Sequence, residues 1–195
     1  MATVFFFVIY SRYHKKVYQD KLAKQNYKEK IAREWLDNLT KEYIFLGTDA
    51  WTSAYEYLTI LASYCKRNST SILLPGIQFN ELESAKDKNE DVLRIVSDLL
   101  SKKLIRIEGM NYSHSFSTPN DTIEALVKFA EKAISKRARF TFITDAPSLI
   151  VRLKCFQNDE FVHIVSIEEV RSRIENSTEW RKYLKKTLED LVEDE

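Results

Sequence analysis

Residues 71–83 read Ser-Ile-Leu-Leu-Pro-Gly-Ile-Gln-Phe-Asn-Glu-Leu-Glu, and the change of pattern within this stretch decides the fold. Ser71–Leu74 is a short apolar run, which predicts a buried strand. Pro75-Gly76 stops that strand, and the residues that follow carry Asn80-Glu81-Leu82-Glu83 on a predicted helix. A buried strand followed at once by a helix is typical of an α/β domain with a parallel sheet.

The same alternation of short apolar strands and amphipathic helices continues on both sides of this stretch, from residue 43 to about residue 170. The predicted strands are Tyr43–Gly47, Ser71–Leu74, Leu104–Ile107, Arg139–Ile143 and Phe161–Val165. Helical stretches between strands imply right-handed crossovers, so we expect an α/β domain whose mostly parallel sheet is covered on both faces. Functional groups of such sheets gather at the carboxyl ends of the strands.

The chain has an extension at each end of this predicted domain. Residues 1–42 are expected to form an apolar segment and a helix from about residue 14, and residues 171–195 a helical extension. The apolar run Ala2–Tyr10 is too short to span a bilayer as a helix, which needs about 20 residues. Its basic residues follow the run, whereas those of a secretory signal precede it. We favour a buried strand or an oligomer contact over the stub of a membrane anchor.

Charge and cysteine content limit the class of protein. The 30 basic and 29 acidic residues nearly cancel, so any contact with nucleic acid must come from local patches rather than from bulk charge. Cys65 and Cys155 lie in helical, apolar surroundings without metal-ligand spacing. Both are predicted to be reduced thiols in or near the core of a cytoplasmic protein.

Acidic residues follow four of the predicted strands. Asp49 follows the first strand, Glu81 lies beyond the second, Asp121 opens the helix after the third, and Asp145 ends the fourth. Carboxylates held together are costly unless a cation compensates them, and all-oxygen ligation suits Mg²⁺ or Mn²⁺. Such a site indicates hydrolysis of a phosphodiester. Each acid also has a structural reading: Asp121 as a helix cap, Asp49 and Asp145 as turn residues, and Glu81 as a solvated helix residue.

Five segments carry a resemblance to the PIN-domain family over roughly residues 43–170. They are Tyr43–Asp49 (YIFLGTD), Ile72–Glu83 (ILLPGIQFNELE), Asn120–Ala125 (NDTIEA), Phe142–Leu149 (FITDAPSL) and Val162–Ser166 (VHIVS). The resemblance implies a PIN-like, Rossmann-type three-layer sandwich with strand order 3-2-1-4-5. It also implies a metal-dependent endoribonuclease in which Asp49, Glu81, Asp121 and Asp145 bind Mg²⁺ or Mn²⁺ and act on single-stranded or structured RNA.

Two departures from the family pattern keep other functions open. Ala50 and Trp51 follow the first acid, where the family has a small hydroxyl residue and then Asn or Asp. Ala146 stands where the family's last motif has an acid, because Asp145 directly follows Thr144. These departures motivate a second hypothesis, a PIN-like RNA-binding or scaffold domain without catalysis. A third hypothesis is a Rossmann-like sensor whose carboxylates contact a small molecule.

Other polar groups are weaker candidates for the site. Lys136-Arg137-Ala138-Arg139, with Arg152 and Lys154, are candidates for phosphate contacts near the sheet edge, although a solvated face also explains them. Ser113-His114-Ser115 lies in a loop that could touch substrate. The extra helices could provide a surface for a homo-oligomer, and membrane contact of the first residues is possible but not favoured.

Overall fold

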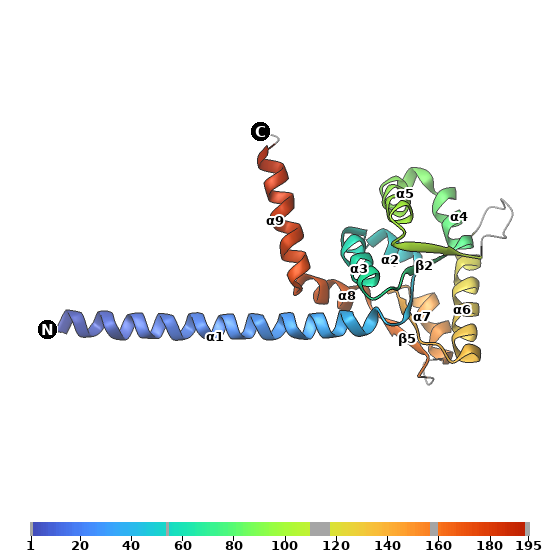
Figure 1. Cartoon of the computed structure of the whole chain (residues 1–195). Coiled ribbons are helices and arrows are strands. Elements are labelled where there is room, and N and C mark those ends of the chain that lie inside the picture. Colours follow the sequence, from blue (N-terminus) through green and yellow to red (C-terminus); the bar gives the residue numbers. More distant parts are fainter. Residues whose placement is uncertain (1, 54, 110–117, 157–159, 194–195) are drawn as a thin grey trace.

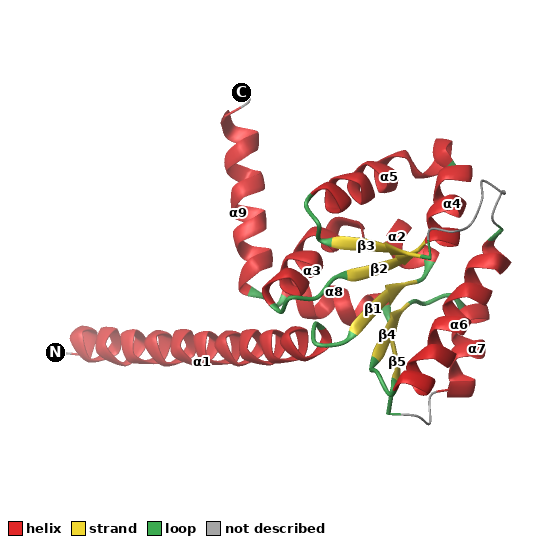
Figure 2. Cartoon of the chain, turned by 45° about the vertical axis from the view of Figure 1, so that its right-hand side comes forward, coloured by secondary structure: helices red, strands yellow, loops and turns green. Residues whose placement is uncertain are grey.

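The computed structural model describes residues 2–53, 55–109, 118–156 and 160–193, with the side chains of 16–53, 57–109, 118–156 and 160–185. At its centre is a parallel sheet of five strands in the order β3-β2-β1-β4-β5 (Figure 2). The strands are β1 (Tyr43–Leu46), β2 (Ile72–Pro75), β3 (Ile105–Glu108), β4 (Phe140–Ile143) and β5 (Val162–Val165). The predicted α/β class and the strand order 3-2-1-4-5 are both confirmed.

Alternating side chains divide the core into two clusters, one on each face of the sheet. Ile44 and Leu46 of β1 point to one face and Phe45 points to the other, as the pleat of a strand requires. Phe45 stacks on Phe140 and Phe142, with ring centroids 5.3 and 5.4 Å apart. Because both faces are covered by helices, the central strands are mostly apolar, and the polar Thr141 of β4 is buried with them.

Helices complete the three layers (Figure 2). The face of Ile44 is covered by α2 (Thr48–Ser53), α3 (Tyr55–Arg67), α4 (Gly76–Ser84), α5 (Lys86–Ser101) and α8 (Ile167–Glu175). The face of Phe45 is covered by α6 (Pro119–Lys136) and by α7 (Pro147–Leu153), which a 3₁₀ turn (Lys154–Phe156) extends. Each strand therefore ends where a helix or its preceding loop begins, and these junctions form the carboxyl edge of the sheet.

The first helix, α1, runs from Ala2 to Leu39, so a strand at residues 2–10 was a wrong prediction. Its last turns join the core through Ala32, Leu36 and Leu39, whereas its amino-terminal part extends away from the rest of the molecule (Figure 1). The last helix, α9 (Thr178–Glu193), also projects beyond the sheet layers (Figure 1). Across the described residues, none of the helices combines the length and the hydrophobicity needed to cross a bilayer.

Three local predictions need correction. The residues after β1 form two helices, α2 and α3, so Asp49 lies in the first turn of a helix rather than in the turn considered for it. The helix predicted to open at Asp121 begins earlier, because Pro119 occupies the first helical position of α6 and Thr118 is its N-cap. Cys65 is buried as expected, but Cys155 is exposed, and both are free thiols. The Ser113-His114-Ser115 candidate lies outside the described residues.

Candidate active site at the carboxyl edge of the sheet

The carboxylate of Asp49 is held between β1 and β4. Its Oδ1 accepts a hydrogen bond of 2.8 Å from the Thr144 hydroxyl, and its Oδ2 accepts one of 2.6 Å from the backbone N–H of Asp145. Gly47 makes room for this arrangement, since a Cβ there would lie 2.3 Å from Asp49 Oδ1 and 2.6 Å from Thr144 Oγ1. The position of Asp49 is therefore fixed by three short segments at the strand ends.

Glu81 is held in a similar way between three helices. Its Oε2 accepts hydrogen bonds from the hydroxyls of Thr48, at 3.1 Å, and Thr122, at 2.5 Å. Thr48 precedes Asp49 at the start of α2, and Thr122 follows Asp121 in the first turn of α6. Glu81 thus connects the ends of β1, β2 and β3 through neutral donors.

Gln78 hydrogen-bonds to the residues that hold Asp49 and Glu81 at this edge. Its side-chain amide donates to the carbonyl oxygen of Leu46 at 2.8 Å and to the Thr48 hydroxyl at 3.4 Å. The Gln78 side chain is completely buried, and its Oε1 has no hydrogen-bond partner among the described residues. An oxygen left without a donor in a buried site favours a bound water or cation nearby.

The other two predicted acids, Asp121 and Asp145, accept hydrogen bonds from backbone N–H groups at helix starts. Asp121 completes the capping box of α6, because its Oδ2 accepts from the backbone N–H and the hydroxyl of Thr118. The Thr118 N–H, followed by the Thr118 hydroxyl, lowers the pKa of the Asp121 carboxyl. Asp145 accepts a bond of 3.2 Å from the N–H of Ile167, at the start of α8. These contacts match the capping role considered for Asp121 and a structural role for Asp145.

A shallow hollow of about 290 Å³ opens at the edge between Asp49 and Asp145. Its other lining residues are Ser53, Ala146, Ile167, Glu168 and Arg171. The Arg171 guanidinium pairs with Glu168 at 3.6 Å and donates to the carbonyl oxygen of Ser53 at 3.4 Å. Its Nε is buried without a hydrogen-bond partner in the described part of the chain. The hollow therefore joins acidic oxygens and one guanidinium.

The predicted site residues are only partly brought together. Asp49 lies beside Asp145, and Glu81 is linked to the Asp49 segment through Thr48. Among the described side chains, no three Asp, Glu, His or Cys residues come close enough to hold a metal ion. The four acids therefore lie along the edge without three of the described ones meeting at one point.

The two departures noted in the sequence have different places in the fold. Ala50 and Trp51 are completely buried in the core, so they lie away from the hollow. Ala146 lines the hollow and is the N-cap of α7. An acid at position 146 would therefore stand at the edge of the site.

The predicted basic candidates lie elsewhere. Lys136–Arg139 precedes β4, so this run lies at the amino edge of the sheet, opposite the acids. Arg152 pairs with Glu124 at 2.6 Å. His163 contacts Glu42 at 2.9 Å, in keeping with a structural role.

Sequence reasoning missed the threonines that hold the acids. A sequence pattern could have identified them, because a threonine is adjacent to three of the four acids, in Thr48-Asp49, Asp121-Thr122 and Thr144-Asp145. Gln78 and Arg171 have no such signal, since only the fold brings them to this edge.

Comparisons of the chain with protein-family models, with curated proteins and with solved structures gave no significant match.

Proposed function

We propose that this chain is a PIN-like, Mg²⁺- or Mn²⁺-dependent endoribonuclease whose site lies at the carboxyl edge of the sheet. The observation that carries the proposal is that Asp49 and Glu81 are fixed there by hydroxyl and backbone donors and by no Lys, Arg or His among the described residues. Carboxylates held by neutral donors keep their negative charge for a cation.

The donor set fits a hard cation. Mg²⁺ retains several waters and is usually bound by one or two carboxylates together with substrate phosphates, so a cage of three protein acids is not required. Asp49 and Glu81 would hold the ion, and the unpartnered Oε1 of Gln78 would accept from a coordinated water. At such a site the ion supplies Lewis-acid stabilisation of charge on the phosphoryl oxygens.

The protein's own residues would position the RNA. Arg171 lines the same hollow as Asp49 and Asp145, so its guanidinium would contact a phosphate oxygen bound there. Thr144 holds Asp49, and the N–H of Asp145 fixes the second oxygen of the same carboxylate. Asp121 and Asp145, both exposed, add negative charge at the rim.

The test is cleavage of a fluorescent single-stranded RNA by the full chain with Mg²⁺, with Mn²⁺ and with a chelator. Asp49→Asn and Glu81→Gln are expected to lower the rate by about 100-fold or more, because loss of the ion removes several kcal/mol of transition-state stabilisation. Asp91→Asn and Glu90→Gln, on the exposed face of α5, are the matched controls and should keep the wild-type rate.

A second candidate is a PIN-like RNA-binding or scaffold domain without catalysis. It is favoured by the capping roles of Asp121 and Asp145, which leave fewer acids committed to an ion. RNA that binds but stays intact with both ions, in the wild-type chain and in all four variants, would replace the first proposal with this one.

A further inference from the structure

The face of the sheet that contains Phe45 is incompletely covered by helices. Helix α6 lies over β1 and β4 on this face, while the side chains of Arg106 and Glu108 on the edge strand β3 remain accessible beside it. Between β3 and α6 the surface is hollowed over about 300 Å³, and a second hollow of about 160 Å³ continues it. Both hollows are lined by Glu108, Phe129 and Lys132, so they form one groove, which we call the β3–α6 groove.

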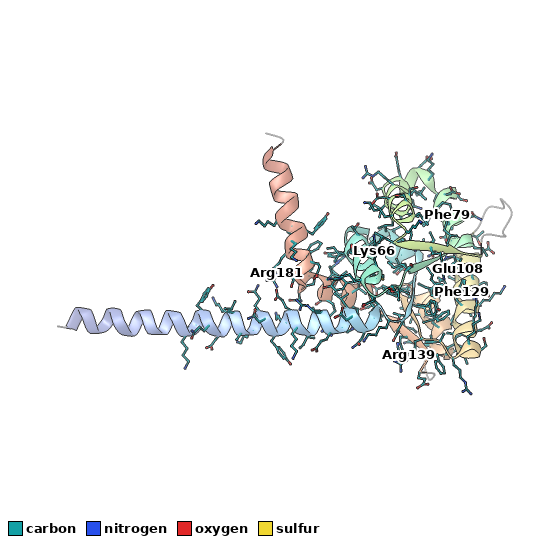
Figure 3. All side chains as sticks on the ribbon, in the orientation of Figure 1. Lys66, Phe79, Glu108, Phe129, Arg139 and Arg181 are labelled. Carbon is teal, nitrogen blue, oxygen red and sulfur yellow. The ribbon has the colours of Figure 1, made fainter. Side chains whose placement is uncertain are left out.

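The groove runs from one edge of the sheet toward the other. At one end it is lined by Tyr43, the first residue of β1, and by Ala138, which precedes β4. This end therefore lies at the amino edge of the sheet. At the other end it is lined by Gly76, the first residue of α4, and by Ala125 of α6. These two helices carry Glu81 and Thr122, so the groove leads toward the acids. Figure 3 shows Glu108 and Phe129 near each other at this side of the molecule.

Basic side chains line one wall of the groove. Lys128, Lys132 and Lys136 are exposed on α6 at intervals of four residues, which places them about 6 Å apart along the helix. None of the three forms a salt bridge with a described residue. Arg106, on the facing strand β3, forms a salt bridge with Glu108 of the same strand. The Lys132 ammonium lies over the ring of Phe129, 5.4 Å from its centroid. A row of exposed ammonium groups is suited to an extended chain of negative charges.

Aromatic rings are also accessible in the groove. Tyr43 is 48% exposed and packs on Phe140 with ring centroids 5.0 Å apart. Phe129 is half-buried, with Phe45 at a centroid distance of 4.6 Å and the Lys132 ammonium over its ring. Grooves that bind single-stranded nucleic acid combine this kind of charged row with aromatic rings on which bases stack. An acidic peptide would use the lysines but would gain little from the rings.

From these features we infer that the β3–α6 groove binds single-stranded RNA and leads it across the sheet face to the carboxyl edge. This inference rests on the proposed ribonuclease function and adds a substrate path that the carboxylate site alone does not provide. The phosphates contact Lys128, Lys132 and Lys136, and a base stacks on Tyr43. Double-stranded RNA is excluded from the path because its bases are already paired and stacked within the helix.

Binding is measured by fluorescence anisotropy with a short labelled oligouridine and the full chain, in the presence of a chelator so that no cleavage occurs. The triple variant K128A/K132A/K136A is expected to bind at least about 10-fold more weakly and to reduce the slope of log affinity against log salt by about 2, since each lost phosphate contact removes about 0.7. The matched control is K21A/K24A/K28A on the exposed part of α1, which makes the same change in net charge.

Tyr43 gives a second, independent readout. Tyr43→Leu should weaken RNA binding several-fold without changing the slope of log affinity against log salt. Tyr43→Phe should keep the wild-type affinity, because stacking needs the ring and not the hydroxyl. Thermal unfolding of each variant checks that the fold is retained.

The outcomes separate this inference from the proposed function. Equal loss of binding in the two lysine triples, or binding of polyglutamate as tight as that of oligouridine, overturns the groove as an RNA site and leaves the nuclease proposal standing. Groove-dependent binding without any metal-dependent cleavage supports the groove and removes the nuclease.

Discussion

The hydroxyl of Thr144 lies 2.8 Å from Oδ1 of Asp49 and ties the end of β4 to the residue that follows β1. Thr144 is almost completely buried, and its oxygen also accepts a bond of 3.1 Å from the N–H of Ala146. One hydroxyl thus fixes both the first acid and the turn that carries Asp145 and Ala146. The site is organised by donors to the acids as much as by the acids themselves.

Asp49 and Thr144 should therefore be coupled in stability. Asp49→Asn and Thr144→Val are each expected to lower the free energy of unfolding by about 1–3 kcal/mol, because each leaves polar groups unpaired. In a urea-unfolding double-mutant cycle the two changes should be non-additive by at least about 0.5 kcal/mol. The exposed control Asp91→Asn should stay within about 0.5 kcal/mol of wild type. Additive losses would show that the hydrogen bond contributes little.

Ala146 offers a gain-of-function test. Because Ala146 lines the hollow with Asp49 and Asp145, Ala146→Asp should add a carboxylate there and increase the Mn²⁺-dependent rise in melting temperature. Asp145→Asn should reduce that rise only modestly, since one of its oxygens already accepts from the N–H of Ile167. If Asp145→Asn abolishes the Mn²⁺ effect and Ala146→Asp leaves it unchanged, Asp145 itself binds the ion.

The two cysteines should differ in reactivity. Burial raises the pKa of the Cys65 thiol to about 12, so it is neutral and inaccessible in the folded chain, whereas Cys155 is exposed. A thiol reagent near pH 8 should modify one thiol rapidly and the second only after unfolding in urea. Cys155→Ser should remove the rapid phase and Cys65→Ser should leave it. Rapid modification of both thiols would mean that the α3 core opens readily.

Alkaline pH should weaken the docking of α9. Burial, together with the hydrogen bond of 2.6 Å to Glu179, raises the pKa of Tyr64 from 10.0 to about 12. The stability contributed by the neutral phenol is therefore complete below pH 10 and is lost as the pH rises through about 12. Urea unfolding followed by tryptophan fluorescence should show a smaller alkaline loss for Tyr64→Phe than for wild type. The exposed control Tyr27→Phe should behave like wild type, and an equal loss in all three would reject this role.

The strands were predictable to within about one residue at most ends because their apolar runs are bounded by Pro, Gly or charged residues. Ile72–Pro75 is an example, since Pro75-Gly76 ends the strand as the pattern predicts. For the run Ala2–Tyr10 only the strand alternative is wrong. Nine apolar residues fit a strand and a helix equally well, and continuity with the helix after residue 14 decides between them.

The site was less predictable than the fold. The acids could be placed at the correct edge from strand order, but the direction of each carboxylate depends on its donors. Asp121 turns to Thr118 because Pro119 fixes the start of α6 two residues earlier than expected. Arg171 and Gln78 reach the edge from distant parts of the chain, and no local pattern marks them.

Helix α1 has a geometrical consequence for access to the site. It meets the sheet at the start of β1, so it approaches from the amino edge, while the acids occupy the opposite one. Among the side chains of α1 that the structure describes, from residue 16 on, Ala32 is the first buried one, and at 1.5 Å per residue the preceding residues 2–28 extend over about 40 Å (Figure 1). A protein or surface bound to the amino-terminal end of α1 would lie on the amino side of the domain. Such an attachment would leave the carboxyl edge of the sheet, with its acids, accessible.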